Sequence, residues 1–151
     1  CSGSLEVECS LKLRIYTDGG SRGNPGPAAA GVVVADADTN KPLWRAGLFL
    51  GRATNNVAEY SGMIAGLKKA AQLGATDVEV VSDSELMVRQ MLGQYRVKNA
   101  GLAPLFAEAT GLCQELGSVR FRHVRRENNI DADRLVNLAL DARRSIEDPP
   151  A

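Results

Sequence analysis

The sequence predicts an α/β fold in which a mixed sheet of about five strands carries helices on its faces. Residues 11–50 hold apolar and polar side chains in alternation or in short apolar runs, which is typical of strands. From residue 54 onward, apolar residues at helical spacing alternate with further short apolar runs. Strands that come first and are followed by alternating helices and strands indicate an antiparallel meander joined to parallel strands in one sheet.

The first part of the chain contains three predicted strands. Residues 11–17 alternate strictly, and this strand ends at Asp18, before a loop over residues 19–27 that is rich in glycine and proline. Residues 30–35 and 43–50 form the next two strands, with a turn between them. Three consecutive strands with short connections predict the antiparallel meander.

The second part contains the predicted helices. Thr54 or Asn55 caps a helix that ends at Gly74, because apolar residues between them recur at three-and-four spacing. A strand at 78–81 then leads into a helix around residues 86–91. The remaining predicted elements are a helix at 103–116, a strand at 119–124 and a helix at 130–143.

The composition is that of one globular domain. The chain has 151 residues, of which 44% are hydrophobic and 24% charged, and it contains neither an internal repeat nor a linker. We therefore expect one domain at residues 11–145. Residues 1–10 are expected to be a terminal extension, disordered or added by cloning, and residues 146–151 a frayed tail.

Charge and cysteine content exclude several classes of protein. There are 18 basic and 18 acidic residues, so the overall charge does not attract a polyanion, and a nucleic-acid partner would depend on local contacts. No apolar run approaches the roughly 20 residues that span a bilayer. The cysteines form no C-x-x-C pair, which argues against a disulfide framework and a zinc site. We expect a cytoplasmic monomer with no membrane partner.

Four acidic residues stand where strands end or helices begin. Asp18 ends the first predicted strand, and Asp83 follows the strand at 78–81. Glu59 and Asp133 lie near the starts of two helices. If the two strands are neighbours, the four carboxylates can meet at one edge of the sheet, where the functional groups of open α/β sheets gather. Taken singly, an Asp at a strand end or helix start is more often a cap or a turn residue, and for Asp18 the two interpretations are equally open, so the prediction depends on the set.

Such a cluster would need a counter-charge, because adjacent ionised carboxylates repel one another. No His or Cys lies near these residues in the sequence, so the ligands would be oxygen atoms, which favours Mg²⁺ or Mn²⁺ over zinc. A pair of such ions can activate an attacking water and stabilise a leaving oxygen. The set therefore indicates phosphodiester hydrolysis.

Four sequence blocks around these carboxylates resemble those of type 1 ribonuclease H, in the same order. The blocks are YTDGGSRGNPGP at 16–27, TNNVAEY at 54–60, SDS at 82–84 and NIDAD at 129–133. The resemblance covers residues 11 to about 143 and implies a ribonuclease H-like fold with helices on both faces of the sheet. It points to the bacterial and archaeal branch that lacks a basic protrusion and includes ribonuclease H domains fused to a phosphatase domain.

The resemblance implies an endoribonuclease that hydrolyses the RNA strand of RNA/DNA hybrids. Asp18, Glu59, Asp83 and Asp133 would bind two Mg²⁺ ions, with Mn²⁺ able to substitute, together with the scissile phosphate. Catalysis with two metal ions would leave 5′-phosphate and 3′-hydroxyl ends. The resemblance also leads us to expect a phosphatase domain on the carboxy-terminal side of the full-length protein.

The resemblance also implies which residues contact the hybrid. Asn24, Asn55 and Asn56, with the backbone of Gly19 and Gly20, would contact the minor groove and the 2′-hydroxyls of the RNA, which distinguish RNA from DNA. For each Asn, a turn or a cap is the alternative. The set expected to hold a phosphate of the DNA strand is Arg52, Thr54 and Asn99, of which Arg52 could equally be an ordinary surface residue.

Two segments depart from the family's pattern. Residues 92–99 pass directly into the next helix with only Arg96 and Lys98 basic, where many relatives have a basic protrusion. This departure predicts weaker and more salt-sensitive binding of the hybrid. Many relatives have a His in the loop before the last carboxylate, whereas this chain has Arg126, our candidate for neutralising charge near the phosphate. His123 is expected in a structural or exposed position.

Two alternatives stay open. A non-catalytic module that binds RNA/DNA hybrids would use the same scaffold, although binding alone gains nothing from negative charge clustered near phosphate. A nucleotide cradle formed by the glycine-rich loop is disfavoured, because neither G-x-G-x-x-G nor the P-loop pattern is present.

Overall fold

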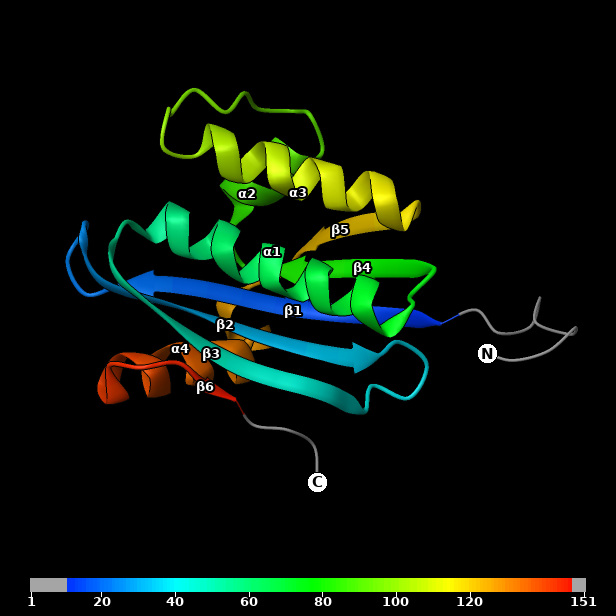
Figure 1. Ribbon diagram of the computed structural model, residues 1–151, viewed down its shortest axis with the longest axis horizontal. Helices are drawn as coiled ribbons and strands as arrows, with labels where there is room; N and C mark the ends of the chain where they lie inside the picture. Colours follow the sequence, from blue (N-terminus) through cyan, green and yellow to red (C-terminus); the bar gives the residue numbers. More distant parts are fainter. Residues whose placement is uncertain (1–10, 148–151) are drawn as a thin grey trace, which may run out of the picture.

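A mixed sheet runs through the whole molecule (Figure 1). The computed structural model describes residues 11–147, so the predictions for residues 1–10 and 148–151 lie outside it. The strands are β1 (Lys12–Ser21), β2 (Gly26–Asp36), β3 (Pro42–Ala53), β4 (Asp77–Ser82), β5 (Val119–His123) and β6 (Ile146–Glu147). They lie in the order β5-β4-β1-β2-β3-β6, with β1, β2 and β3 antiparallel and β4 and β5 parallel to β1. The predicted mixed sheet with an antiparallel meander is confirmed.

The sheet has six strands instead of the predicted five. Ile146 and Glu147 form β6, which pairs antiparallel with Gly47 and Ala46 of β3, so the prediction of a frayed tail is wrong for these two residues. The side chain of Ile146 lies against Gly47, and the Trp44 Nε1 donates a hydrogen bond to Glu147. These contacts hold β6 against β3. Two residues alone show little periodicity in the sequence.

The first strand is longer than its sequence pattern indicates. β1 continues through Asp18 to Ser21, and Gly19, Gly20 and Ser21 pair with β2, where a loop was predicted. Small residues on both strands allow this pairing, since Gly19 and Gly20 lie opposite alanines. Only residues 22–25 form the turn of the hairpin. Asp18 therefore lies inside a strand instead of at its end.

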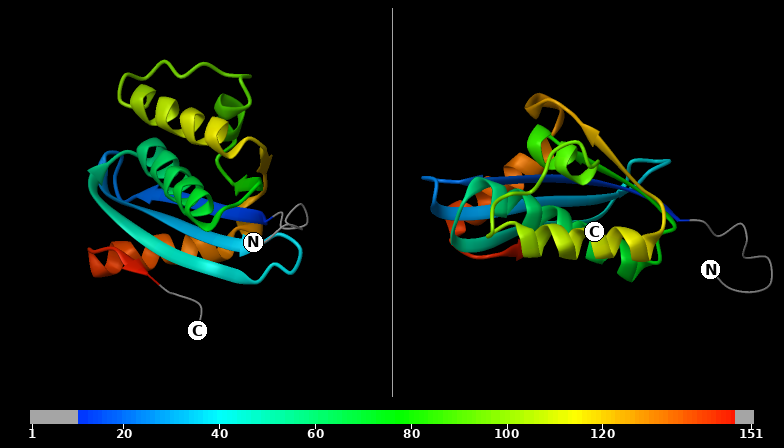
Figure 2. Two further views of the ribbon diagram at one scale, coloured as in Figure 1. Left: turned by 45° about the vertical axis from the view of Figure 1, so that its right-hand side comes forward. Right: turned by 90° about the horizontal axis from the view of Figure 1, so that it is seen from above.

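Helices cover both faces of the sheet, as predicted. The helices are α1 (Asn55–Leu73), α2 (Glu85–Met91), α3 (Ala103–Leu116) and α4 (Ile130–Ala142), with a short 3-10 helix, η2 (Arg126–Asn128), before α4. α1 packs on β1 and β2, and α3 packs on α1. α4 lies on the other side of the sheet in all the views (Figures 1 and 2). Among the described residues, no helix has both the length and the apolar character needed to cross a bilayer.

Glycines let the helices approach the sheet on each face. A Cβ on Gly66 of α1 would lie 2.4 Å from a methyl carbon of Ile15, and one on Gly31 of β2 would lie 2.0 Å from the carbonyl oxygen of Ala132 in α4. Real Cβ atoms do not come this close, so both contacts require glycine. These contacts fix the faces: Ile15 faces α1, and Gly31 faces α4.

Candidate active site

Asp18 projects from β1 toward α4. It lies opposite Gly31 in the antiparallel pair, and opposed residues of such a pair place their side chains on the same face. Because Gly31 faces α4, Asp18 does too. Its side chain is 6% exposed, and its Oδ1 accepts a hydrogen bond from the backbone N–H of Gly19 at 2.9 Å. A carboxylate is thus buried between the sheet and the start of α4.

Gly19 brings the start of α1 against β1 at this point. A Cβ on Gly19 would lie 2.4 Å from the backbone nitrogen of Glu59 and 2.5 Å from the carbonyl carbon of Ala58. Only glycine tolerates such a backbone contact. The contact places Glu59, in the second turn of α1, beside Asp18, although the two residues are 41 positions apart.

Asp83 joins these two carboxylates from β4. This strand is parallel to β1 and pairs Ser82 with Thr17, so Asp83 follows the paired segment next to Asp18. The Ser82 hydroxyl accepts a hydrogen bond from the Ser84 N–H, which turns the chain into α2. One oxygen from each carboxylate of Asp18, Glu59 and Asp83 lies within 4.8 Å of the other two. The structure therefore brings together three of the four predicted carboxylates in one group.

Asp133 lies beside this group, in the first turn of α4. It lines the same cavity as Asp18 and Glu59, whose volume is about 340 Å³. Asn129 fixes this end of α4, because its Nδ2 donates to the Thr17 carbonyl of β1 at 2.8 Å and its carbonyl accepts from the Asp133 N–H at 3.2 Å. Asn129 is thus a bridge between the residue before Asp18 and the turn that carries Asp133.

The shared burial changes the acidity of the group. Burial raises the pKa of Asp18 to about 8, with the charge of Asp83 and a side-chain hydrogen bond with Asp133 acting in the same direction. Burial also raises the pKa of Glu59 to about 9, with the charges of Asp18 and Asp83 adding to the effect. The carboxyl groups of Asp18 and Glu59 therefore hold their protons more tightly than isolated carboxyl groups do.

These residues fit a divalent cation. One Glu59 oxygen, Oε1, is buried with no hydrogen-bond partner, and the three clustered side chains offer only carboxylate oxygens. Carboxylate oxygens are the ligands that hard cations such as Mg²⁺ prefer. The residues able to hold such ions are Asp18, Glu59 and Asp83, with Asp133 adjacent.

Arg126 is the cation of the described residues that approaches this group. Its Nε lies 3.7 Å from the Oδ2 of Asp83, it lines the cavity, and its charge lowers the pKa of Glu59 against the larger effect of burial. The Arg126 side chain is 83% exposed, so it neutralises the group only in part. His123 lies in β5 opposite Ser82, is exposed, and does not line the cavity.

The residues expected to contact RNA lie around the start of α1. The Asn24 side chain accepts a hydrogen bond from the Asn55 N–H at 3.1 Å, which ties the β1–β2 turn to the helix. Gly20 and Asn55 line the cavity with the carboxylates, whereas Asn56 is exposed outside it. Thr54 is the cap of α1, its hydroxyl accepting from the Val57 N–H at 3.3 Å. Asn24 and Thr54 therefore have local structural roles as well.

The three residues expected to hold a DNA phosphate lie at separate places in the structure. Arg52 is exposed on β3 and lines a separate cavity of about 290 Å³ that Phe49 and Arg143 also line. Asn99 is exposed before α3, where its Oδ1 accepts a hydrogen bond from the Gly101 N–H at 2.7 Å. Neither Thr54 nor Asn99 lines the Arg52 cavity.

Sequence reasoning missed three residues that shape the site. Asn129 was read only as part of a motif, although it carries the link between β1 and α4. Arg22 and Asn137 line the cavity, and Arg22 is paired with Asp141 of α4 at 2.8 Å. Asn137 could have been found from its spacing, because it lies one helical turn after Asp133 and therefore on the same face of the helix.

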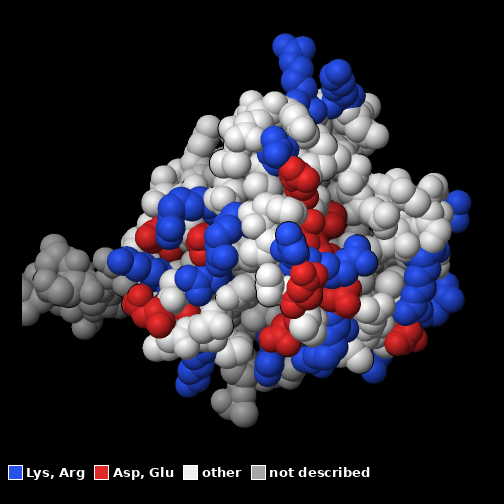
Figure 3. Space-filling model, turned by 180° about the vertical axis from the view of Figure 1, so that it is seen from behind, with Lys and Arg blue, Asp and Glu red and all other residues white. Residues whose placement is uncertain are grey.

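Basic and acidic side chains intermingle on the face of the molecule that carries α4 (Figure 3). No field of a single sign covers this face, in agreement with equal numbers of basic and acidic residues. A polyanion would therefore be held by individual contacts and not by long-range attraction.

The comparisons with known proteins give one consistent result. A family model described as reverse transcriptase-like matches residues 16–139. The bifunctional protein Rv2228c of Mycobacterium tuberculosis is 48% identical over 132 residues, which are 87% of this chain but 36% of that protein. The chain therefore spans about a third of the length of this relative.

Solved structures agree in fold and in length. The N-terminal RNase H domain of the same mycobacterial protein is 49% identical, with a TM-score of 0.85 over 88% of this chain and 96% of that one. RNase H1 from Halobacterium salinarum is 40% identical, with a TM-score of 0.83 over 87% and 98%. LC11-RNase H1, solved in complex with an RNA/DNA hybrid, is 43% identical, with a TM-score of 0.82 over 87% and 98%.

Proposed function

Because the chain belongs to the ribonuclease H family, we propose that it is a metal-dependent endoribonuclease that hydrolyses the RNA strand of RNA/DNA hybrids. The observation that carries this proposal is the group formed by Asp18, Glu59 and Asp83, with Asp133 beside it. Two relatives named RNase H1 support the substrate, one of them solved with an RNA/DNA hybrid. A module that only bound hybrids would gain nothing from carboxylates beside a phosphate.

The carboxylates would hold two Mg²⁺ ions, with Mn²⁺ as a substitute. When bound, such ions supply the charge that activates water for in-line attack and stabilises the leaving 3′ oxygen, leaving 5′-phosphate and 3′-hydroxyl ends. Asp18 lies on β1, Asp83 directly follows the neighbouring parallel strand β4, and the contact at Gly19 holds the start of α1 with Glu59 beside them, so the fold itself brings these ligands together. This preorganisation is the protein's own contribution.

The residues around the cavity would orient the hybrid. Gly20 and Asn55 line the cavity, and Asn24 lies beside Asn55, so these groups can contact RNA hydroxyls next to the carboxylates. Arg126 would neutralise charge near the scissile phosphate, because it stands over Asp83 with most of its side chain in solvent. Arg52, Thr54 and Asn99 would contact the DNA strand at separate points.

A cleavage assay on matched duplexes tests the proposal. Labelled RNA/DNA, RNA/RNA and DNA/DNA duplexes of one sequence are incubated with the protein, with and without Mg²⁺. We expect cleavage of the RNA strand of the hybrid only, and only with metal. Binding of the hybrid without cleavage at any Mg²⁺ or Mn²⁺ concentration would establish the non-catalytic module instead.

A further inference from the structure

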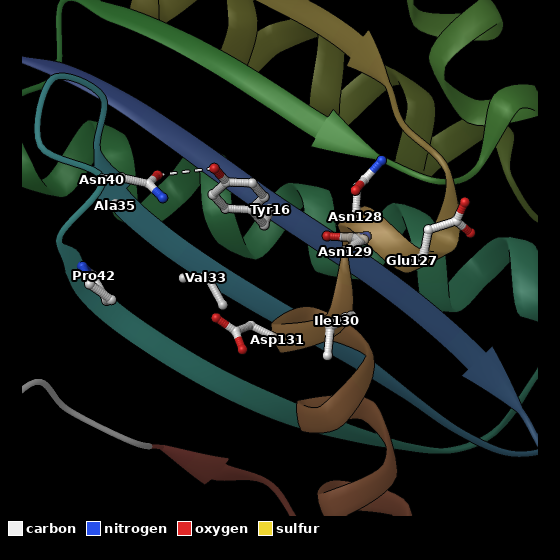
Figure 4. Close-up of a pocket in the computed structure, with 10 residues that line it drawn as sticks. All are labelled: Tyr16, Val33, Ala35, Asn40, Pro42, Glu127, Asn128, Asn129, Ile130 and Asp131. Atoms are coloured by element: carbon white, nitrogen blue, oxygen red, sulfur yellow. Dashed lines mark hydrogen bonds between the residues drawn. The ribbon is translucent and has the colours of Figure 1, made fainter.

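A second cavity lies on the same face of the sheet as the carboxylates but shares no lining residue with their cavity. We call it the corner pocket, because it lies where η2 turns into α4 above β1 and β2 (Figure 4). Its volume is about 280 Å³, enough for a small ring system with one or two substituents. None of the roles proposed above for the nuclease uses it.

Part of the corner pocket has apolar walls. Tyr16 of β1 and Val33 of β2 are a cross-strand pair, and Ala35 follows on the same face of β2. α4 begins at Ile130 and does not extend over these residues, so this part of the sheet is not covered by the helix. Ile130 is 64% exposed at the edge of the pocket. These surfaces favour a flat, partly apolar ligand.

Two hydrogen-bond acceptors stand out among the polar groups of the pocket, the side-chain oxygen of Asn129 and the carboxylate of Asp131. The Asn129 side chain is buried, at 2% exposure, and its Oδ1 has no hydrogen-bond partner because the bond to Thr17 uses Nδ2. In Figure 4 this oxygen points toward Tyr16 and Val33, and the Asp131 carboxylate also lies over the β2 side of the pocket. A ligand that brings N–H groups would therefore satisfy a buried acceptor.

The charge of the pocket selects for a cation. The lining includes two carboxylates and neither Lys nor Arg. Arg14 reaches the lining residue Asn40 at 3.5 Å but is engaged in an ion pair with Glu79 at 2.8 Å, and Lys41, between the lining residues Asn40 and Pro42, is exposed and does not line the pocket. The start of α4 would favour an anion, but Asp131 and Asp133 in its first turn already offset the helix dipole.

We propose that the corner pocket is a binding site for a small planar cation, in which an aromatic or similarly flat body stacks between Tyr16 and Ile130 and N–H groups reach Asn129 and Asp131. Amidines and protonated heterocyclic amines have this chemistry. Asn129 also bonds the backbone on either side of the nuclease group, so a ligand in the pocket touches the residue that connects β1 to the turn of Asp133. The proposal is independent of the nuclease activity.

Benzamidine is a suitable probe, because it is a phenyl ring with a planar amidinium. It is titrated into the ¹⁵N-labelled protein in the presence of Mg²⁺, and amide shifts are followed residue by residue. We expect saturating shifts at residues 33–42 and 127–131 with an affinity of about millimolar, as is usual for so small a ligand. Neutral benzamide is expected to bind about tenfold more weakly, and benzoate not to saturate.

Variants at exposed positions separate this site from general attraction to acidic groups. Asp131→Asn and Ile130→Ala should each weaken benzamidine binding about fivefold, since each removes one recognition element. Asp38→Asn is the matched control: it removes one exposed carboxylate from the nearby β2–β3 turn but not from the pocket, and should leave the affinity unchanged.

The proposal is overturned by any of three results. Shifts confined to Gly19, Gly20 and Glu59 would place the cation among the nuclease carboxylates. Equal binding of benzoate would identify an anion site at the helix start. Unchanged affinity in both Asp131→Asn and Ile130→Ala, with the spectra of folded proteins, would show that the pocket is not the site.

Discussion

The carboxylate of Glu79 and the group formed by Asp18, Glu59 and Asp83 lie at different points along β1 and β4 and have opposite electrostatic surroundings. Glu79 of β4 lies between Arg14 of β1 at 2.8 Å and Arg122 of β5 at 3.2 Å. Burial alone would raise the pKa of Glu79, but hydrogen bonds from these arginines lower it. Farther along β1, at Asp18, and at the neighbouring Glu59 of α1, burial and mutual repulsion raise the pKa values to about 8 and 9.

The difference shows which acidic residues stabilise the fold and which do not. The negative charge of Glu79 is balanced by two arginines of the same chain, so the folded protein needs no external cation there. Among residues 11–147, the largely exposed Arg126 is paired with the group of Asp18, Glu59 and Asp83, whereas Arg22 of the same cavity is paired with Asp141. A bound cation would supply the positive charge that the group lacks. The predictions below separate these two regions.

The largest expected effect is on cleavage. Asp83→Asn should lower Mg²⁺-dependent cleavage of an RNA/DNA hybrid about a thousandfold or more, because it removes a ligand and a negative charge from the group. Glu79→Gln, the matched change in β4, the strand that Asp83 directly follows, should alter the rate by less than about twofold. Similar rates for the two variants would contradict the division of roles.

Gly19→Ala tests the positioning of Glu59. The added Cβ would have to displace α1 from β1, so we expect a loss of about 1–3 kcal/mol in the free energy of unfolding. Because Glu59 moves with α1, cleavage should fall by about 10- to 100-fold. Both are measured on one preparation, by denaturant titration and by initial rates. Gly111→Ala in α3, where a Cβ meets nothing within 4 Å, should leave cleavage unchanged and raise the free energy of unfolding by about 0.5–1 kcal/mol, because Ala is a better helix former than Gly.

The raised pKa values predict the pH dependence of stability without metal. A carboxyl whose pKa is higher in the folded state stabilises the protein fully below its unfolded pKa, near 4, and loses this contribution as the pH rises toward 8 or 9. In EDTA, Asp18→Asn should therefore be more stable than the natural sequence at pH 8, by about 1–3 kcal/mol, but not at pH 4. If the free energy of unfolding changed with pH in the same way for both proteins, the raised pKa of Asp18 would be refuted.

The smallest effect, of opposite sign, is expected at Glu79. Its pKa is lowered by folding, so its contribution is present above about pH 4.3 and is lost as the pH falls through the folded value. Glu79→Gln should destabilise the protein by about 0.5–1 kcal/mol at pH 7 and by less near pH 3. Thermal unfolding at the two pH values measures the difference.

The sequence predicted most of the elements, because their periodicity is local. α3 has the predicted bounds, α1 ends at Gly74, and the meander of β1 to β3 is present. The strand through Gly19 and Gly20 was missed, because glycine signals a turn unless a partner strand of small residues is known. β6 was missed because two residues carry no period.

The carboxylates were found because each lies within a distinctive block, but their surroundings were not. The burial of Asp18, the close approach at Gly19 and the bridge through Asn129 depend on contacts between segments 40 to 112 residues apart. No local pattern encodes such contacts. The corner pocket likewise joins a cross-strand pair to the start of a helix that lies far away in the sequence.

Proton release on Mg²⁺ binding tests the central claim most directly. Calorimetric titrations of Mg²⁺ at pH 7 are compared in buffers of different ionisation enthalpy, with Asp18→Asn as the control. Because Asp18 and Glu59 have pKa values of about 8 and 9, Mg²⁺ should displace about one to two protons, and fewer from Asp18→Asn. Binding with no proton release, or no binding at millimolar Mg²⁺, would contradict a group of carboxylates held together for cations.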